Sequence, residues 1–147
     1  MVSPFDPRAI LLARHAQHVV VIHFPIALFT CGVGLDLLSR GKRHSHFATA
    51  AYLNLCIAAA TILPAAVTGL LAWQFALDGK RLRGLLLLHV IAGVIAAVVV
   101  IASWGVHWRT RQSELVLPRY RIPIELVGVA VVAVTAHLGG FLSGVNQ

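Results

Sequence analysis

The chain has 147 residues, of which 59% are hydrophobic and 12% are charged, and its mean hydropathy is +0.85. Soluble domains carry about 25% charged residues, so this composition excludes a disordered chain, a nucleic-acid-binding tail and an ordinary water-soluble enzyme. The net charge of +7 does not indicate a nucleic-acid partner, because the basic residues form short clusters between long apolar stretches.

Four long stretches contain no Asp, Glu, Lys or Arg: residues 15–35, 44–77, 84–108 and 126–147. Each reaches the roughly 20 residues that a helix needs to cross a bilayer. Because unpaired backbone groups are too costly in lipid, spanning segments of this length are helices. We therefore predict four transmembrane helices, near residues 16–38, 48–77, 84–107 and 123–144.

The connections between these helices are short, at about residues 39–47, 78–83 and 108–122. Short connections join antiparallel neighbours. The sequence therefore predicts an all-α fold, an integral membrane antiparallel four-helix bundle, as one domain over residues 1–147. We call side A the side that holds both termini and the 78–83 connection, and side B the opposite side.

Lysine and arginine counts predict the orientation, because cytoplasmic loops are enriched in both. Side A carries five basic residues, namely Arg8, Arg14, Lys80, Arg81 and Arg83. Side B carries seven, namely Arg40, Lys42, Arg43, Arg109, Arg111, Arg119 and Arg121. We predict that side B is cytoplasmic.

The chain has eight histidines, which is many for a membrane protein. With a rise of about 1.5 Å per residue, His23, His89 and His137 lie about 9–15 Å from side A on three different helices. His18 lies one and a half turns outward from His23. Ionisable side chains at such depth are costly and usually face the bundle interior with a partner. We therefore predict that these four histidines form a ligand-binding layer.

Imidazole nitrogens suit iron, copper, zinc and nickel. We favour haem b, one or two per chain, because no Asp, Glu or Met lies in the same layer to complete a copper or zinc shell. His89 and His137 are the preferred axial ligands of the haem iron, followed by His23 and then His18. A histidine-ligated copper or zinc site is the alternative. The glycines that would leave flat space for a haem are Gly69, Gly93, Gly139 and Gly140.

Side B carries the two acids near the helix interiors, Asp36 and Glu125, and we expect either to pair with a nearby arginine. A proton relay is the alternative role for them. His107 lies at the same end, but no histidine of another predicted helix lies at its level, so we do not expect it to hold a haem. Cys31 and Cys56 have no CxxC spacing and are expected to be small apolar packing residues.

Several of these segments resemble one family. The stretch from His18 to Leu28, with its HFPIAL sequence, is similar to the HPxxVHFPIAL opening of the DUF2231 family of uncharacterised bacterial four-helix membrane proteins. The AAVTGLLAW segment at residues 65–73 resembles a second motif of that family, and His89 and the HLGGFL segment from His137 resemble the rest. The sequence departs from the family at Val19, where the family has proline, and at Ala72, where it has an acid.

The resemblance implies a multi-pass protein of the bacterial inner (cytoplasmic) membrane, often found beside cytochromes and other redox proteins. With side B cytoplasmic, the N- and C-termini would be periplasmic. It implies no established activity, so the haem hypothesis depends on the histidine layer.

We hypothesise a b-type haem-binding, cytochrome b-like subunit that passes electrons between a quinol and a redox partner on side A. It would be an electron-transport subunit of a larger complex rather than a stand-alone enzyme, since no hydrolase or nucleotide motif is present. Its expected partners are the lipid bilayer, membrane or c-type cytochrome subunits and a quinone, with no nucleic acid. The alternative is a non-catalytic structural subunit of a respiratory or photosynthetic complex, whose small-residue faces would contact neighbouring helices.

Overall fold

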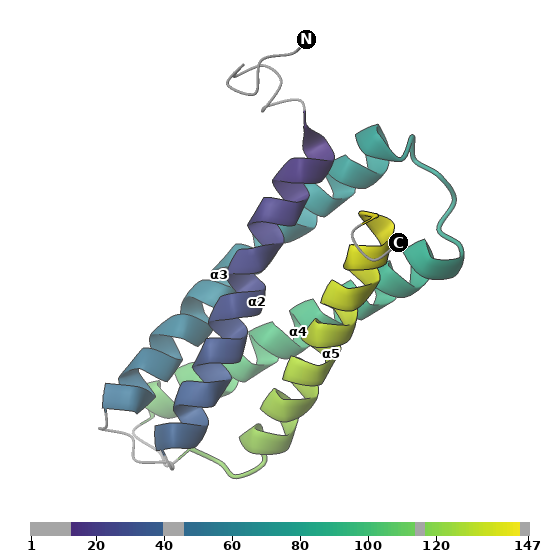
Figure 1. Cartoon of the computed structure of the whole chain (residues 1–147). Coiled ribbons are helices and arrows are strands. Elements are labelled where there is room, and N and C mark those ends of the chain that lie inside the picture. Colours follow the sequence, from purple (N-terminus) through teal and green to yellow (C-terminus); the bar gives the residue numbers. More distant parts are fainter. Residues whose placement is uncertain (1–12, 40–45, 114–116, 145–147) are drawn as a thin grey trace.

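The computed structural model describes residues 13–39, 46–113 and 117–144. These residues form four α-helices (Figure 1). In chain order they are α2 (Arg14–Ser39), α3 (His46–Ala76), α4 (Gly84–Gln112) and α5 (Arg121–Leu142). All four are long and apolar enough to cross a membrane. The predicted all-α membrane bundle is confirmed.

The four helices form two antiparallel hairpins, α2 with α3 and α4 with α5. α2 packs mainly on α3 and α4 packs mainly on α5, whereas the contacts between the two hairpins are fewer. The start of α2, the connection between α3 and α4 and the end of α5 lie at the same end of the bundle, the upper end in Figure 1. This end is side A as the sequence defines it.

The helix ends differ from the predicted ones by up to five residues. The largest difference is at α4, which was predicted to end at residue 107 and continues to Gln112. The prediction stopped where charged residues begin, but a helix does not end where its side chains leave the hydrocarbon. Arg111 extends over the Tyr52 ring, 4.6 Å from its centre. Thr110 donates its hydroxyl hydrogen to the Val106 carbonyl within the same turn.

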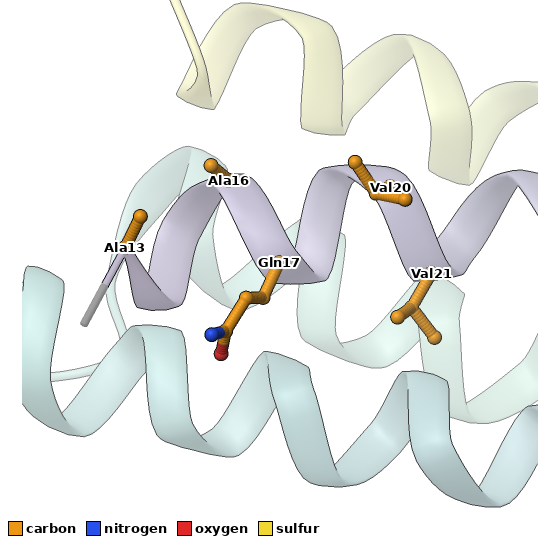
Figure 2. A pocket seen from close by; sticks show the side chains of 5 residues that line it. All are labelled: Ala13, Ala16, Gln17, Val20 and Val21. Atoms are coloured by element: carbon orange, nitrogen blue, oxygen red, sulfur yellow. The ribbon is translucent and has the colours of Figure 1, made fainter. Parts of the chain in front are cut away.

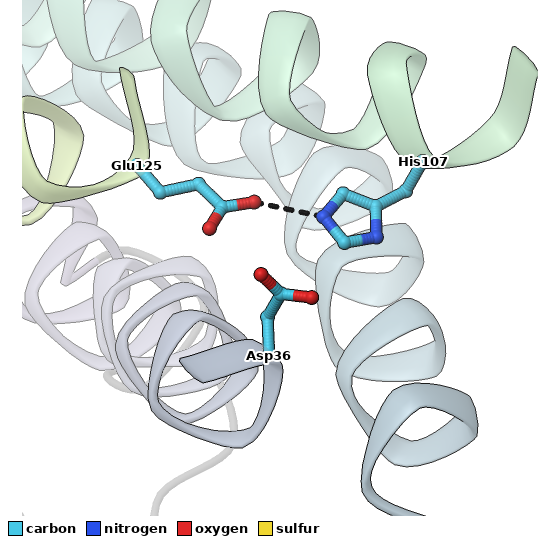
Figure 3. Close-up of side chains that lie close together, drawn as sticks. All are labelled: Asp36, His107 and Glu125. Atoms are coloured by element: carbon cyan, nitrogen blue, oxygen red, sulfur yellow. Dashed lines mark hydrogen bonds and ion pairs between the residues drawn. The ribbon is translucent and has the colours of Figure 1, made fainter. Parts of the chain in front are cut away.

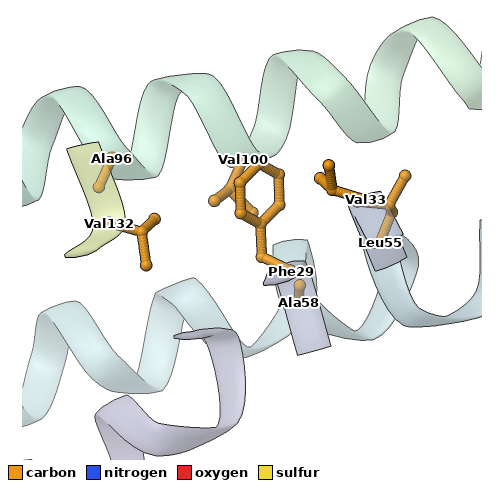
Figure 4. Packing of buried hydrophobic residues seen from close by; sticks show 7 residues of the cluster. All are labelled: Phe29, Val33, Leu55, Ala58, Ala96, Val100 and Val132. Atoms are coloured by element: carbon orange, nitrogen blue, oxygen red, sulfur yellow. The ribbon is translucent and has the colours of Figure 1, made fainter. Parts of the chain in front are cut away.

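The apolar core lies between the hairpins, in the middle and towards side B. Phe29 is fully buried and points from α2 towards Val100 on α4 (Figure 4). It packs close to Gly128 of α5, where a Cβ atom would lie 2.8 Å from the Phe29 ring. The absence of a side chain at residue 128 is therefore what lets α5 approach this ring. The buried residues of the core cluster are Phe29, Val33, Leu55, Ala58, Ala96, Val100 and Val132.

The second hairpin is buried only in its side-B part. The buried residues of α4 all lie from Ala96 onward, and those of α5 all lie at or before Val132. The side-A parts of both helices contain no buried residue among those described. The second hairpin is therefore tightly packed towards side B and loosely packed towards side A.

The contact between Gly128 and Phe29 can be tested with Gly128→Ala. The added methyl group would lie 2.7 Å from Val99 Cγ1 and 2.8 Å from Phe29 Cζ, and overpacking of this kind costs about 1–3 kcal/mol. We expect the variant to unfold at a lower temperature than the wild type in detergent micelles.

Gly34→Ala is the matched control, because a Cβ atom there meets nothing within 4 Å. Both variants gain the same helix propensity from alanine, so the difference between them isolates the clash. Equal melting temperatures would show that α5 does not approach Phe29 as described.

Candidate functional site

Four buried polar side chains meet near side B. Arg121 Nε of α5 donates to Asp36 Oδ2 of α2 at 2.8 Å, and His107 Nε2 of α4 donates to Glu125 Oε1 of α5 at 2.8 Å. All four residues are at most 4% exposed. Figure 3 shows the three acid and imidazole groups pointing towards one another from three helices. We call these residues the side-B cluster: Asp36, His107, Arg121 and Glu125.

Two oxygens of this cluster have no hydrogen-bond partner. They are Asp36 Oδ1 and Glu125 Oε2, and both atoms are buried. Ser103, one turn before His107 on the same face of α4, is also buried and has an unpartnered hydroxyl. With a neutral imidazole, two carboxylates face a single guanidinium, so the cluster carries a net charge of −1. A buried uncompensated charge is costly, and the cluster therefore favours one further positive charge.

The helix ends explain why these residues can be buried. Asp36 lies in the last turn of α2, Arg121 is the first residue of α5, and His107 and Glu125 lie within two turns of the side-B ends of their helices. Polar side chains near helix ends are close to the polar membrane surface. The chain therefore avoids placing these groups at the centre of the membrane.

The sequence predicted part of this cluster. The expected pairing of an acid with an arginine is confirmed for Asp36, whose partner is Arg121. Glu125 was expected to pair in the same way, and its direct partner is His107 instead. His107 was not predicted as a member of this cluster, because only a second histidine at its level was considered as its partner. The feature of the sequence that could have identified this pair is the similar depth of His107 and Glu125 near side B.

Two of the predicted histidines, His18 and His89, lie near side A, one in each hairpin. His18 of α2 lies over Gly69 of α3, where a Cβ atom would be 3.0 Å from the imidazole Cε1. His89 of α4 lies over Gly139 of α5, where the corresponding distance is 3.2 Å. The two imidazoles are half-buried and close enough to interact electrostatically. The structure thus brings together one histidine from each hairpin.

Hydrogen bonds orient both rings in the same way. His89 Nδ1 lies 3.1 Å from the Thr135 carbonyl oxygen, which can only accept, so Nδ1 carries the hydrogen. His18 Nδ1 lies 3.2 Å from Thr68 Oγ1, and the hydrogen of that hydroxyl is already donated to carbonyls of α3. In the neutral form of each ring, Nε2 therefore carries the lone pair that can bind a metal.

The other two predicted ligands lie elsewhere. His23 is exposed and its Nδ1 donates to the Val19 carbonyl of its own helix at 2.5 Å. His137 is exposed and its ring contacts Phe141 edge-on, with 5.0 Å between ring centres. Neither side chain is placed against His18 or His89 by the described contacts. The interaction described for His89 with another histidine is the electrostatic one with His18.

An apolar pocket of about 340 Å³ lies along the first turns of α2 (Figure 2). The described residues that line it are Ala13, Ala16, Gln17, Val20 and Val21. Neither His18 nor His89 is among the residues that line this pocket.

These features define the protein as a four-helix membrane bundle with polar sites near both ends. The sequence matches the family DUF2231, described as a predicted membrane protein, over residues 14–146. Because that match covers nearly the whole chain, the protein belongs to this family. No curated protein and no solved structure matches the chain.

The ion pair between Asp36 and Arg121 gives a prediction about stability. Arg121→Met removes the guanidinium and leaves a buried carboxylate, and breaking a buried pair from one side costs about 3–5 kcal/mol. We expect a large drop in the melting temperature of the purified protein in micelles.

The double variant Asp36→Leu, Arg121→Met removes both charges and provides the comparison. Replacing both partners by apolar residues is often neutral, so we expect it to be more stable than Arg121→Met. If the double variant is the less stable of the two, the buried charge does not dominate the energetics of this pair.

Proposed function

We propose that this protein binds one haem b between its two hairpins, with His18 and His89 as axial ligands, and transfers electrons within the membrane. The observation that carries the proposal is a pair of half-buried imidazoles, one from each hairpin, that interact electrostatically. The Nδ1 atom of each ring hydrogen bonds to the second helix of its own hairpin. The outer hydrogen bond of a metal-binding histidine commonly fixes the ring in this way.

The surroundings of the two rings support a flat ligand. Gly69 and Gly139 leave room for the imidazoles to lie against the helix backbones, since a Cβ atom at either position would press on the ring. The side-A parts of α4 and α5 contain no buried residue among those described. The donor set and the loose packing therefore both fit a group that separates the hairpins.

A haem with two histidine ligands has no open coordination position, so it supplies one-electron transfer rather than substrate chemistry. The protein would hold it near side A, within reach of a redox partner at that surface. We therefore infer an electron-transport subunit that connects a quinol with a partner such as a c-type cytochrome, as part of a larger membrane complex.

A reduced-minus-oxidised visible spectrum and a pyridine haemochrome assay test this proposal. The protein is made with added haem precursor and purified in detergent. We expect a b-type spectrum with one haem per chain. His18→Ala and His89→Ala should each abolish it, because each removes one of the two iron ligands. Added imidazole should restore part of the spectrum of a folded variant.

His23→Ala and His137→Ala are the matched controls, since both side chains are exposed. We expect both variants to keep the wild-type spectrum. Loss of haem in His137→Ala with retention in His18→Ala would assign His89 and His137 as the pair instead. A wild-type protein without haem would favour the structural-subunit hypothesis.

The orientation forms part of the proposal. We infer that side B is cytoplasmic and that both termini are periplasmic in the inner membrane. Three of the seven basic residues behind this inference, Arg40, Lys42 and Arg43, lie outside the described residues, as does Arg8 on side A.

Reporter fusions in bacterial cells test the orientation. Alkaline phosphatase is active only in the periplasm, so we expect activity when it is fused after Gln147 and none when it is fused in the connection between α4 and α5. The reverse pattern would place side A in the cytoplasm.

A further inference from the structure

We propose that Asp36, His107 and Glu125 form a binding site for one divalent transition-metal ion of the zinc type. This site is separate from the proposed haem site, because it lies at the opposite end of the bundle. It does not depend on whether a haem is present.

The geometry of the three side chains supports this site. One ligand atom from each residue lies within 4.8 Å of the other two, and the three atoms come from α2, α4 and α5. Ligands of a zinc ion lie about 2.0–2.2 Å from the metal, so only a small contraction of the side chains would bring all three to one ion. An imidazole with two carboxylates is a donor set that zinc, manganese and iron accept.

The unpartnered oxygens are a second, independent observation. Asp36 Oδ1 and Glu125 Oε2 belong to residues that are 0% exposed, and neither atom has a hydrogen-bond partner. Buried carboxylate oxygens without a donor are costly. A cation between the side chains would satisfy both oxygens at once.

The charged groups around the site also favour a bound cation. The groups that meet there are Asp36 from α2, His107 from α4, and Arg121 and Glu125 from α5. α3 carries no Asp, Glu, Lys or Arg. Arg121 engages Oδ2 of Asp36 and leaves Oδ1 for the metal. The guanidinium would thus hold the carboxylate in place rather than occupy its ligand position.

The metal would replace the hydrogen that His107 Nε2 and Glu125 Oε1 share in their hydrogen bond. His107 Nε2 now donates to Glu125 Oε1, so the nitrogen must lose that hydrogen before its lone pair can bind a metal. The ring keeps its neutral charge by holding its hydrogen on Nδ1 when Nε2 binds the ion.

The experiment titrates metal-free protein in detergent micelles with Zn²⁺ by calorimetry. We expect one equivalent of Zn²⁺ to bind and the melting temperature to be higher with the metal. Co²⁺ in place of Zn²⁺ should give the absorption of a nitrogen- and oxygen-ligated ion.

Glu125→Gln and Asp36→Asn each remove one ligand charge while keeping the size of the side chain. Loss of a residue that only hydrogen bonds to a metal ligand lowers metal affinity roughly 10–100-fold. We expect each of these variants to lower the Zn²⁺ affinity by more than that, because each changes a direct ligand. Having two variants keeps the test valid if one does not fold. His23→Asn and His137→Asn, which change exposed imidazoles, should bind Zn²⁺ as the wild type does.

Three outcomes would overturn the proposal. They are no Zn²⁺ binding by the wild type, undiminished binding by both cluster variants, and loss of binding in the exposed-histidine controls, which would indicate adventitious surface binding. His18→Ala and His89→Ala should retain the Zn²⁺ affinity. A failure of the haem proposal therefore leaves this result unchanged, and the two failures can be told apart.

Discussion

A charge buried in an apolar bundle must be matched by another charge, and this requirement organises the side-B end of the molecule. α3, the described helix that packs most closely on α2, carries no Lys or Arg that could match Asp36. Its partner Arg121 begins α5, so the ion pair joins the first hairpin to the second. The contact between His107 and Glu125 then fixes α4 against α5 at the same level.

The apolar core continues from this polar contact towards the middle of the membrane. Phe29 fills the space that Gly128 leaves on α5, and the two hairpins are held together there by close packing. On the side-A side of Ala96 in α4 and of Val132 in α5, none of the described residues of these two helices is buried. The second hairpin is thus closely packed near side B and more open near side A.

The sequence predicted the helices well because the membrane imposes a simple rule on composition and length. The depth of each histidine also followed from the helical rise, but its direction did not. His18 and His23 are five residues apart and point about 140° away from each other around the helix, so they cannot both face His89. The partner of Asp36 lies 85 residues further along the chain, and sequence alone could not choose among the arginines of side B.

The two hairpins repeat one local design in sequences that show no visible repeat. In each, the first helix carries a histidine near its side-A start, and the second helix carries a glycine under that ring and a threonine that supplies the hydrogen-bond acceptor. The two halves of the side-A end are thus pseudo-symmetric in chemistry. Anything that lies between them meets the same kind of surface on both of its faces.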